Sequence, residues 1–160
     1  MPVYLSVAPP DGFSRWSDAD WDRWLRDHPW EAAERLCSRG DWATFLYQIR
    51  QHARRAGKAL DPLLEQLVNE RPLTAQQAED LRGALRAARA ELDAQPAEAA
   101  RATDRDFAGA EDLDTRIAAA RARAGKEPTL AEAWADLFSR VEKLLDDAVS
   151  RQRGVYFGNV

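Results

Sequence analysis

The chain has 160 residues, of which 45% are hydrophobic and 31% charged, and it carries a formal net charge of −4. We expect one domain, 1–160, because a chain of this length buries roughly 68–70% of its unfolded surface. Its one cysteine excludes an internal disulfide framework. No apolar run approaches the roughly 20 residues needed to span a bilayer. Since the first residues also lack a signal-peptide pattern, we expect a cytoplasmic protein without a membrane partner.

The first and last segments of the chain have the patterns of strands. Val3, Leu5 and Val7 alternate along one side before the turn-forming residues 9–12 end the run. Residues 154–160 are rich in aromatic and β-branched side chains. Because two strands alone are marginal in water, we expect these strands to pair with each other across a helical core, or with a second chain.

The first predicted helix begins at Ser17, whose spacing to Asp20 matches a variant of the capping box. Trp16 and Trp21 occupy the two positions of a hydrophobic staple. Residues spaced three and four apart then form one helical face. That face consists of Trp21, Trp24, Leu25 and His28, and Pro29 ends the helix or opens the next.

Two more helices are predicted between residues 30 and 57. The first is short, carries Trp30, Ala33 and Cys37 on one face, and ends at Gly40. Asp41 is the predicted N-cap of the second, which Gly57 closes. The apolar stripe of this second helix consists of Trp42, Phe45, Leu46, Ile49, Ala53 and Ala56.

The remaining helices are marked mainly by their start signals. Asp61-Pro62 begins one, and capping boxes at Thr74 with Gln77 and at Thr129 with Glu132 begin two longer ones. We expect residues 97–127 to be less ordered or peripheral, with a helix at 110–124 and a loop or frayed turn at 97–109. The predicted fold class is therefore mainly α, a compact bundle of six or seven helices whose short N- and C-terminal strands pair.

Catalytic and metal-binding patterns are scarce. Cys37 could form a thiol triad with a histidine, but its predicted place on a buried helix face makes a reactive thiolate unfavourable. No cysteine or histidine pair has zinc-ligand spacing. The run from Asp18 to Asp22 fails as a calcium loop because Arg23 and Pro29 stand where Gly and Glu are required. We predict no cofactor, no metal and no enzymatic activity, with an enzyme using carboxylates or Cys37 as an alternative.

Charge is unevenly distributed along the chain. Residues 11–34 carry seven acidic groups against three arginines, whereas residues 35–60 carry six basic groups against one aspartate. The basic island lies near a predicted helix C-terminus, where the helix dipole favours cations. Nucleic-acid binders carry a larger basic surplus, so we expect no nucleic-acid partner. The island consists of Arg50, Arg54, Arg55 and Lys58.

The unusual feature is the set of six tryptophans, five of which lie in the first third of the chain. They can be core residues, since large aromatic side chains dominate small cores. Alternatively, some are exposed anchors within a charged rim, as in protein-binding hot spots, and the acidic rim would steer a basic partner. Tryptophan faces also stack on sugars or cationic ligands. The candidate partner-binding residues are Trp16, Trp24, Trp30, Asp18, Asp22, Asp27, Glu31 and Glu34.

We therefore predict a small helical interaction protein that binds a protein partner through this acidic, tryptophan-rich N-terminal region. An inhibitor, an immunity-like or antitoxin-like neutraliser and an adaptor all fit that description. The alternative is a small-ligand binding or sensor protein with a tryptophan-walled pocket between helices. The sequence is also compatible with a homo-oligomer.

Overall fold

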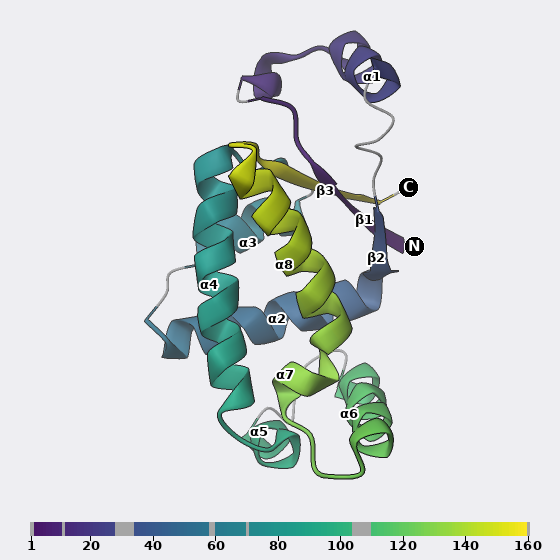
Figure 1. Ribbon diagram of the computed structural model, residues 1–160, viewed down its shortest axis with the longest axis vertical. Helices are drawn as coiled ribbons and strands as arrows, with labels where there is room; N and C mark the ends of the chain where they lie inside the picture. The colour runs from purple at the N-terminus through teal and green to yellow at the C-terminus, as the bar shows by residue number, and fades with distance from the viewer. Residues whose placement is uncertain are drawn as a thin grey trace.

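The computed structural model describes residues 2–10, 12–27, 34–57, 60–69, 71–103 and 110–159. Within these ranges, eight α-helices accompany a small three-stranded antiparallel sheet, which confirms the mainly α fold class. The sheet lies toward one end of an elongated molecule, and both chain termini lie beside it (Figure 1). None of the helices in these ranges combines the length and the apolar character needed to cross a bilayer.

The two terminal strands pair as predicted. β1 (Pro2–Val7) runs antiparallel to β3 (Val155–Asn159), with Val3 opposite Asn159 and Val7 opposite Val155. The alternating residues Val3, Leu5 and Val7 are all buried, as their pattern indicates. The N-terminal strand is central, since the strand order is β2-β1-β3.

The third strand, β2 (Glu34–Ser38), was not predicted. Residues 34–38 were expected to end a short helix, and the residues from 28 to 33 lie outside the described ranges. Pairing with β1 places Cys37 opposite Val3 and buries Leu36. The stabilisation from this strand pairing and burial exceeds the weak local preference of these residues for a helix. An Arg140 guanidinium nitrogen also donates to the Leu36 carbonyl oxygen at 3.0 Å. The helix prediction for residues 34–38 is therefore wrong.

A new helix, α2 (Arg39–Arg55), begins directly after this strand. The Ser38 hydroxyl accepts a hydrogen bond from the Asp41 backbone N–H at 3.1 Å, so Ser38 is the N-cap. Asp41 lies in the first turn, and Gly40 does not end a helix. The predicted end does hold, because Gly57 follows α2 with a φ of +73°.

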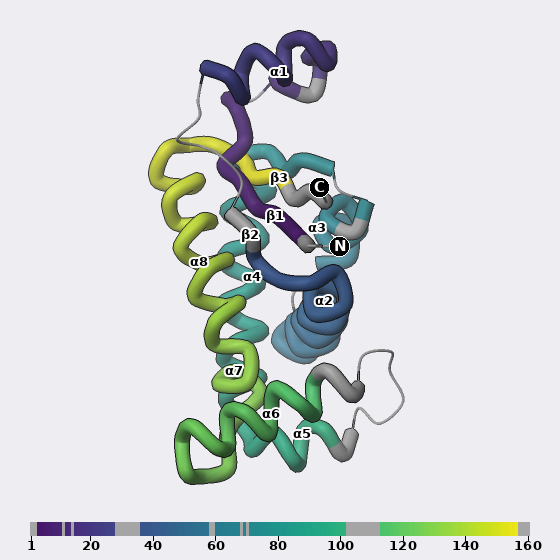
Figure 2. The backbone as a smooth tube through the Cα atoms, turned by 90° about the vertical axis from the view of Figure 1, so that its right-hand side faces the viewer, coloured from purple at the N-terminus to yellow at the C-terminus, as the bar shows by residue number. Residues whose placement is uncertain are grey.

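Three long helices form most of the core. α4 (Ala75–Asp93) and α8 (Ala135–Ser150) run side by side, and α2 crosses them (Figures 1 and 2). The Trp134 indole N–H donates to the Gln48 side-chain oxygen at 2.6 Å, joining the start of α8 to α2 in the interior. The predicted apolar stripe of α2 is buried at Phe45 and Ile49, and α4 and α8 bury apolar stripes of their own, including Leu81, Leu85, Leu92, Leu137, Phe138, Val141 and Leu145.

Shorter helices complete the fold. α3 (Asp61–Val68) packs beside α2, whereas α5 (Ala97–Thr103), α6 (Ala110–Ala124) and α7 (Leu130–Ala133) lie at the end farthest from the sheet (Figure 1). The α6 helix was predicted. The loop predicted for residues 97–109 is wrong for 97–103, where Ala97 and Ala100 are buried. Asp104 and the residues up to 109 lie outside the described ranges.

The connection from α8 into β3 depends on a close backbone approach. Leu73 and Val155 exchange two backbone hydrogen bonds, with N···O distances of 2.7 and 3.2 Å. A Cβ atom placed on Gly154 would lie 1.8 Å from the Leu73 carbonyl oxygen. Only glycine fits there without displacing the backbone, so Gly154 fixes how β3 joins the helices.

Candidate functional site

Residues 12–27 form an arm that projects beyond the sheet, away from the helical body. It contains a 3₁₀ turn, η1 (Phe13–Arg15), and α1 (Asp18–Asp27), and two perpendicular views place α1 at the tip (Figures 1 and 2). In contrast to α2, α4 and α8, α1 buries none of its residues. The arm therefore lies at the periphery of the fold, and its helix contributes no buried residue to the core.

The start of α1 follows its predicted signals. The Asp20 carboxylate accepts hydrogen bonds from the Ser17 backbone N–H at 2.9 Å and from the Ser17 hydroxyl at 2.8 Å. The Asp20 backbone N–H in turn donates to the Ser17 hydroxyl oxygen at 3.3 Å. Trp16 and Trp21 meet edge to face, with ring centroids 5.9 Å apart, as a hydrophobic staple requires. These local contacts fix the entry of the chain into the helix.

Aromatic and cationic contacts anchor the arm to the body. Trp21 meets Phe13 and the β3 residue Tyr156 edge to face, at centroid separations of 5.7 and 5.4 Å. The Arg153 guanidinium carbon lies 4.8 Å from the centre of a Trp24 ring, and its Nε donates to the Ala8 carbonyl oxygen at 2.9 Å. The orientation of the arm is therefore fixed by contacts of Trp21 and Trp24 with Tyr156 and Arg153.

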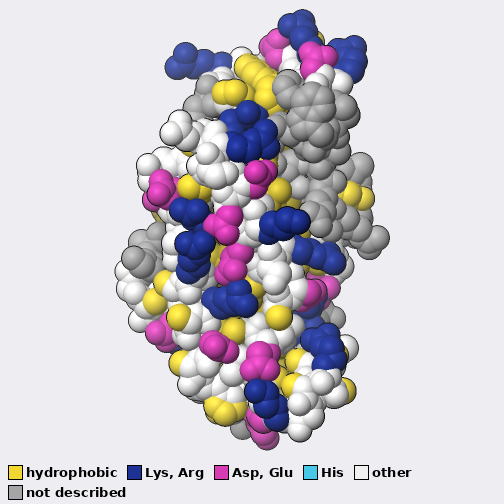
Figure 3. Space-filling model, in the orientation of Figure 1, with side chains coloured by type: hydrophobic (Ala, Val, Ile, Leu, Met, Phe, Trp, Pro, Cys, Tyr) yellow, Lys and Arg dark blue, Asp and Glu magenta, His cyan; other side chains and the backbone are white. Residues whose placement is uncertain are grey.

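One flank of the arm contains a shallow hollow of about 250 Å³, lined by Trp16, Asp20, Arg23, Trp24 and Asp27. Asp20, Trp24 and Asp27 are spaced i, i+4 and i+7, which places them on one side of α1. The two tryptophans are half-buried, so part of each ring remains open to solvent. In Figure 3 hydrophobic side chains lie directly beside charged ones on the arm, at the top of the view.

The hollow contains two carboxylates and one guanidinium. Hydrogen bonds from the Ser17 side chain and backbone lower the pKa of Asp20 below its ordinary value, so this carboxylate is charged at neutral pH. Arg23 approaches it only to 4.0 Å, and 68% of the Arg23 side chain is exposed. The whole arm contains four aspartates and three arginines. The arm itself is nearly neutral, and the negative charge is concentrated in the hollow.

The structure brings together only some of the predicted site residues. Trp16, Trp24 and Asp27 share the hollow. Asp18 and Asp22 are exposed on the opposite flank, at the helical spacing that groups them with Leu25. Glu34 begins β2, and of the predicted site Trp30 and Glu31 lie outside the described residues.

Asp20 and Arg23 were missed by sequence reasoning. Asp20 was interpreted only as a capping residue, although its spacing to Trp24 and Asp27 was a usable signal for a shared flank.

A second cavity lies between α2 and α3. Its volume is about 400 Å³, and it is open to solvent, with the buried side chains of Leu46 and Leu64 among its lining residues. Tyr47 is its aromatic lining residue, whereas Trp42 and Trp134 are buried in the core. Two tryptophans line the hollow on the arm, whereas the lining of this interhelical cavity contains none. The complete lining is Ala43, Leu46, Tyr47, Arg50, Asp61, Leu64 and Glu65.

The predicted basic island is partly neutralised. Arg50 and Arg54 both contact the Asp61 carboxylate, with N···O distances of 2.6 and 3.0 Å, and these hydrogen bonds lower the Asp61 pKa. Arg55 is exposed, and Lys58 lies outside the described residues. Two of the four cations of the island are therefore paired within the fold.

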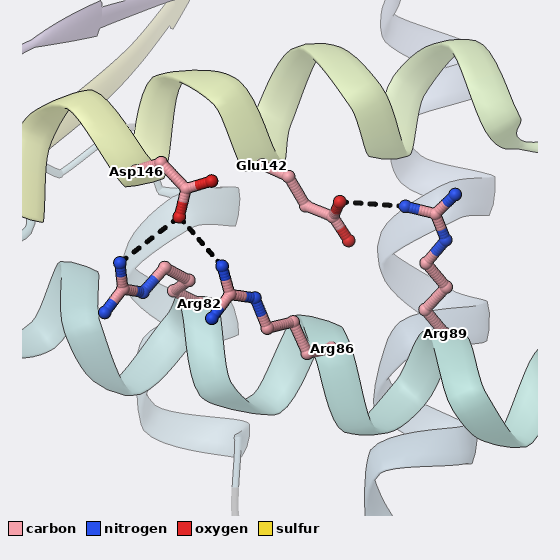
Figure 4. Close-up of polar contacts among 5 residues, drawn as sticks. All are labelled: Arg82, Arg86, Arg89, Glu142 and Asp146. Carbon is pink, nitrogen blue, oxygen red and sulfur yellow. Dashed lines mark hydrogen bonds and ion pairs between the residues drawn. The ribbon is translucent and has the colours of Figure 1, made fainter.

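Charged side chains also bridge α4 and α8. Figure 3 shows alternating cationic and acidic groups along this face, and Figure 4 shows how five of them pair. Arg82 and Arg86 contact one oxygen of Asp146 at 3.2 and 2.9 Å, and Arg89 contacts Glu142 at 2.8 Å. These groups hold two helices together, which explains their positions without a ligand.

Of the residues considered for thiol chemistry, the structure describes Cys37, which is half-buried, and His52, which is buried. Burial raises the pKa of the Cys37 thiol to about 12, and the nearby Asp41 carboxylate adds to the effect. His52 is buried on α2, only 1% exposed, and His28 lies outside the described residues. In the described ranges no group of three His, Cys, Asp or Glu side chains has an arrangement that could hold a metal ion.

No model of a protein family, no curated protein and no solved structure matches this chain.

Proposed function

We propose that this protein binds a protein partner through the arm. The observation that carries the proposal is that α1 buries none of its residues although Trp21, Trp24 and Leu25 occupy its apolar face. Leu25 is 44% exposed, and Trp24 is half-buried. Aromatic anchors surrounded by charged side chains are typical of the residues that dominate binding energy at protein interfaces.

The anchoring of the arm supports the same function. A surface held in one conformation before binding loses less conformational entropy when a partner docks. The capping pair of Ser17 and Asp20 and the stacking of Arg153 on Trp24 provide such preorganisation. Such a preformed surface suits an inhibitor, a neutraliser of the immunity or antitoxin type or an adaptor.

The test is quantitative affinity capture from an extract of the native host, with three baits. They are the unaltered protein, Trp24→Ala on the arm, and Tyr47→Ala on α2. Tyr47 is a suitable control because it and Leu25 are the exposed large hydrophobic residues of the described chain. Far-UV circular dichroism verifies that both variants are folded.

We expect a protein that the unaltered and Tyr47→Ala baits retain and that Trp24→Ala loses. With the captured protein purified, Trp24→Ala should weaken binding about thirtyfold, since truncating an anchor at the centre of an interface costs about 2 kcal/mol or more. Equal retention by all three baits would contradict the proposal, and so would a loss confined to Tyr47→Ala.

A second candidate function is the binding of a small ligand in the cavity between α2 and α3. Its volume of about 400 Å³ lies within the range of ligand pockets, and its lining combines apolar side chains with Arg50, Asp61 and Glu65. Thermal-shift screening of a metabolite library tests this function. A stabilising ligand should lose its effect in Ala43→Trp, which fills the cavity, and retain it in Trp24→Ala.

A further inference from the structure

We propose that the hollow on the arm recognises an arginine side chain of the partner protein, which binds against the indoles of Trp16 and Trp24 and the carboxylates of Asp20 and Asp27. This inference rests on the proposed function and names the group that the arm recognises. The partner must therefore expose an arginine on its surface, and the residues around the hollow form the rest of the interface.

The first argument is the chemistry of the lining. A guanidinium is attracted both to the face of an indole and to a carboxylate, and the hollow offers two groups of each kind. The one cation in the lining, Arg23, is mostly exposed and lies 4.0 Å from Asp20. Among the lining residues two carboxylates outnumber one guanidinium, which favours an incoming cation, and the Arg153 guanidinium over Trp24 is not part of this lining.

The second argument is that the same chain already uses this combination of groups internally. The Arg116 guanidinium carbon lies 4.3 Å from the centre of a Trp134 ring. Its nitrogens contact Asp41 at 3.3 Å and Asp136 at 2.9 Å, so one guanidinium is held by an indole and two aspartates from different helices. The hollow presents an indole and two aspartates at the surface, with room of about 250 Å³ beside them.

The third argument concerns the tryptophan itself. Arg153 already stacks on a Trp24 ring, so this indole attracts a guanidinium, and the partner arginine binds the parts of Trp16 and Trp24 that line the hollow. Arginine fits better than lysine because its planar guanidinium stacks on aromatic rings and can contact a carboxylate with two N–H groups. A lysine ammonium is more strongly hydrated and provides a point charge only.

The test uses a small probe rather than the partner. The ¹⁵N-labelled protein is titrated with N-acetyl-arginine amide while the indole N–H signals of Trp16 and Trp24 are followed by NMR. N-acetyl-citrulline amide, which has nearly the same shape without the charge, is the matched control. We expect saturable shifts of both indole signals with the arginine probe, weaker binding of the lysine analogue and no saturable shift with citrulline.

Two variants of equal charge locate the binding site. Asp27→Asn removes a carboxylate from the hollow, whereas Asp22→Asn removes one from the opposite flank of the same helix. Asp20 is left intact because it also caps α1. An exposed ion pair contributes up to about 1 kcal/mol, so Asp27→Asn should weaken binding of the arginine probe about two- to fivefold. Asp22→Asn should leave its affinity unchanged.

The inference is overturned if citrulline binds as well as arginine, if both variants weaken binding equally, or if neither indole signal shifts. These outcomes are independent of the capture experiment. If Trp24→Ala loses the partner but the arginine probe does not bind in the hollow, the proposed function is supported and the arginine site is rejected. If the arginine probe binds but no captured protein depends on Trp24, the arginine site is supported and the proposed function is rejected.

Discussion

Replacing Gly154 with alanine should destabilise the protein strongly, because the added methyl group has no space. Its carbon would lie 1.8 Å from the Leu73 carbonyl oxygen and 2.9 Å from the carbonyl carbon, and both of these atoms belong to the backbone. The backbone of β3 must therefore move away from Leu73. That movement breaks the two hydrogen bonds between Leu73 and Val155, whose residues are both fully buried.

The size of the effect follows from those hydrogen bonds. Each contributes about 1 kcal/mol net, and a buried backbone group left without a partner costs about 1–3 kcal/mol. We expect Gly154→Ala to lower the free energy of unfolding by about 3 kcal/mol. For a chain of this length, that corresponds to a fall in melting temperature of about 6–12 °C.

Gly83→Ala is the matched control with the opposite expected sign. Gly83 lies within α4, and an added Cβ meets no atom within 4 Å. Because alanine favours the helix over glycine, this change should raise the free energy of unfolding by about 0.5–1 kcal/mol. Urea unfolding followed by far-UV circular dichroism measures both. A Gly154→Ala variant within about 0.5 kcal/mol of the unaltered protein would refute the reasoning.

Three further changes test other contacts. At pH 8, native Cys37 should react with iodoacetamide roughly a thousandfold more slowly than in urea, because its pKa of about 12 exceeds the ordinary 9.0; equal rates would contradict its burial. Ser17→Ala should raise the pKa of Asp20 toward 3.8, as read by NMR titration. The Asp20 contribution to stability is complete above pH 3.8 and disappears as pH falls through its lower folded pKa, so an unchanged titration would contradict the capping contact. Arg116→Ala should lower the free energy of unfolding by about 1–3 kcal/mol, and Arg116→Lys should recover only part of it, since lysine cannot reproduce the stacked, two-carboxylate geometry.

Helix starts could be predicted because their signals are local. The capping pairs Ser17 with Asp20 and Thr74 with Gln77 form within three residues, and so does the Thr129 cap. The same spacing occurs at Ser38 and Asp41. It was overlooked because Gly40 suggested the end of a preceding helix.

The third strand could not be predicted from its own residues. Nothing in the run from Glu34 to Ser38 favours a strand strongly, and its conformation is fixed by pairing with β1 (Pro2–Val7), far earlier in the chain. The pairing of β1 with β3 was predictable because both strands carry strong local patterns and neither is stable alone.

The candidate site was partly visible in the sequence. Trp16, Trp24 and Asp27 were selected as aromatic anchors and an acidic neighbour, and they share the hollow. The choice of Asp18 and Asp22 instead of Asp20 followed from counting charges along the chain rather than around the helix. Which flank faces outward depends on Tyr156 and Arg153, residues near the far end of the chain.

The sharpest single test of the arm as a docking surface is the affinity of a captured partner for two variants, Trp24→Ala and Tyr47→Ala. If the arm binds the partner, Trp24→Ala weakens the affinity about thirtyfold and Tyr47→Ala leaves it unchanged. If the two variants bind the partner as tightly as the unaltered protein does, the arm is not the docking surface.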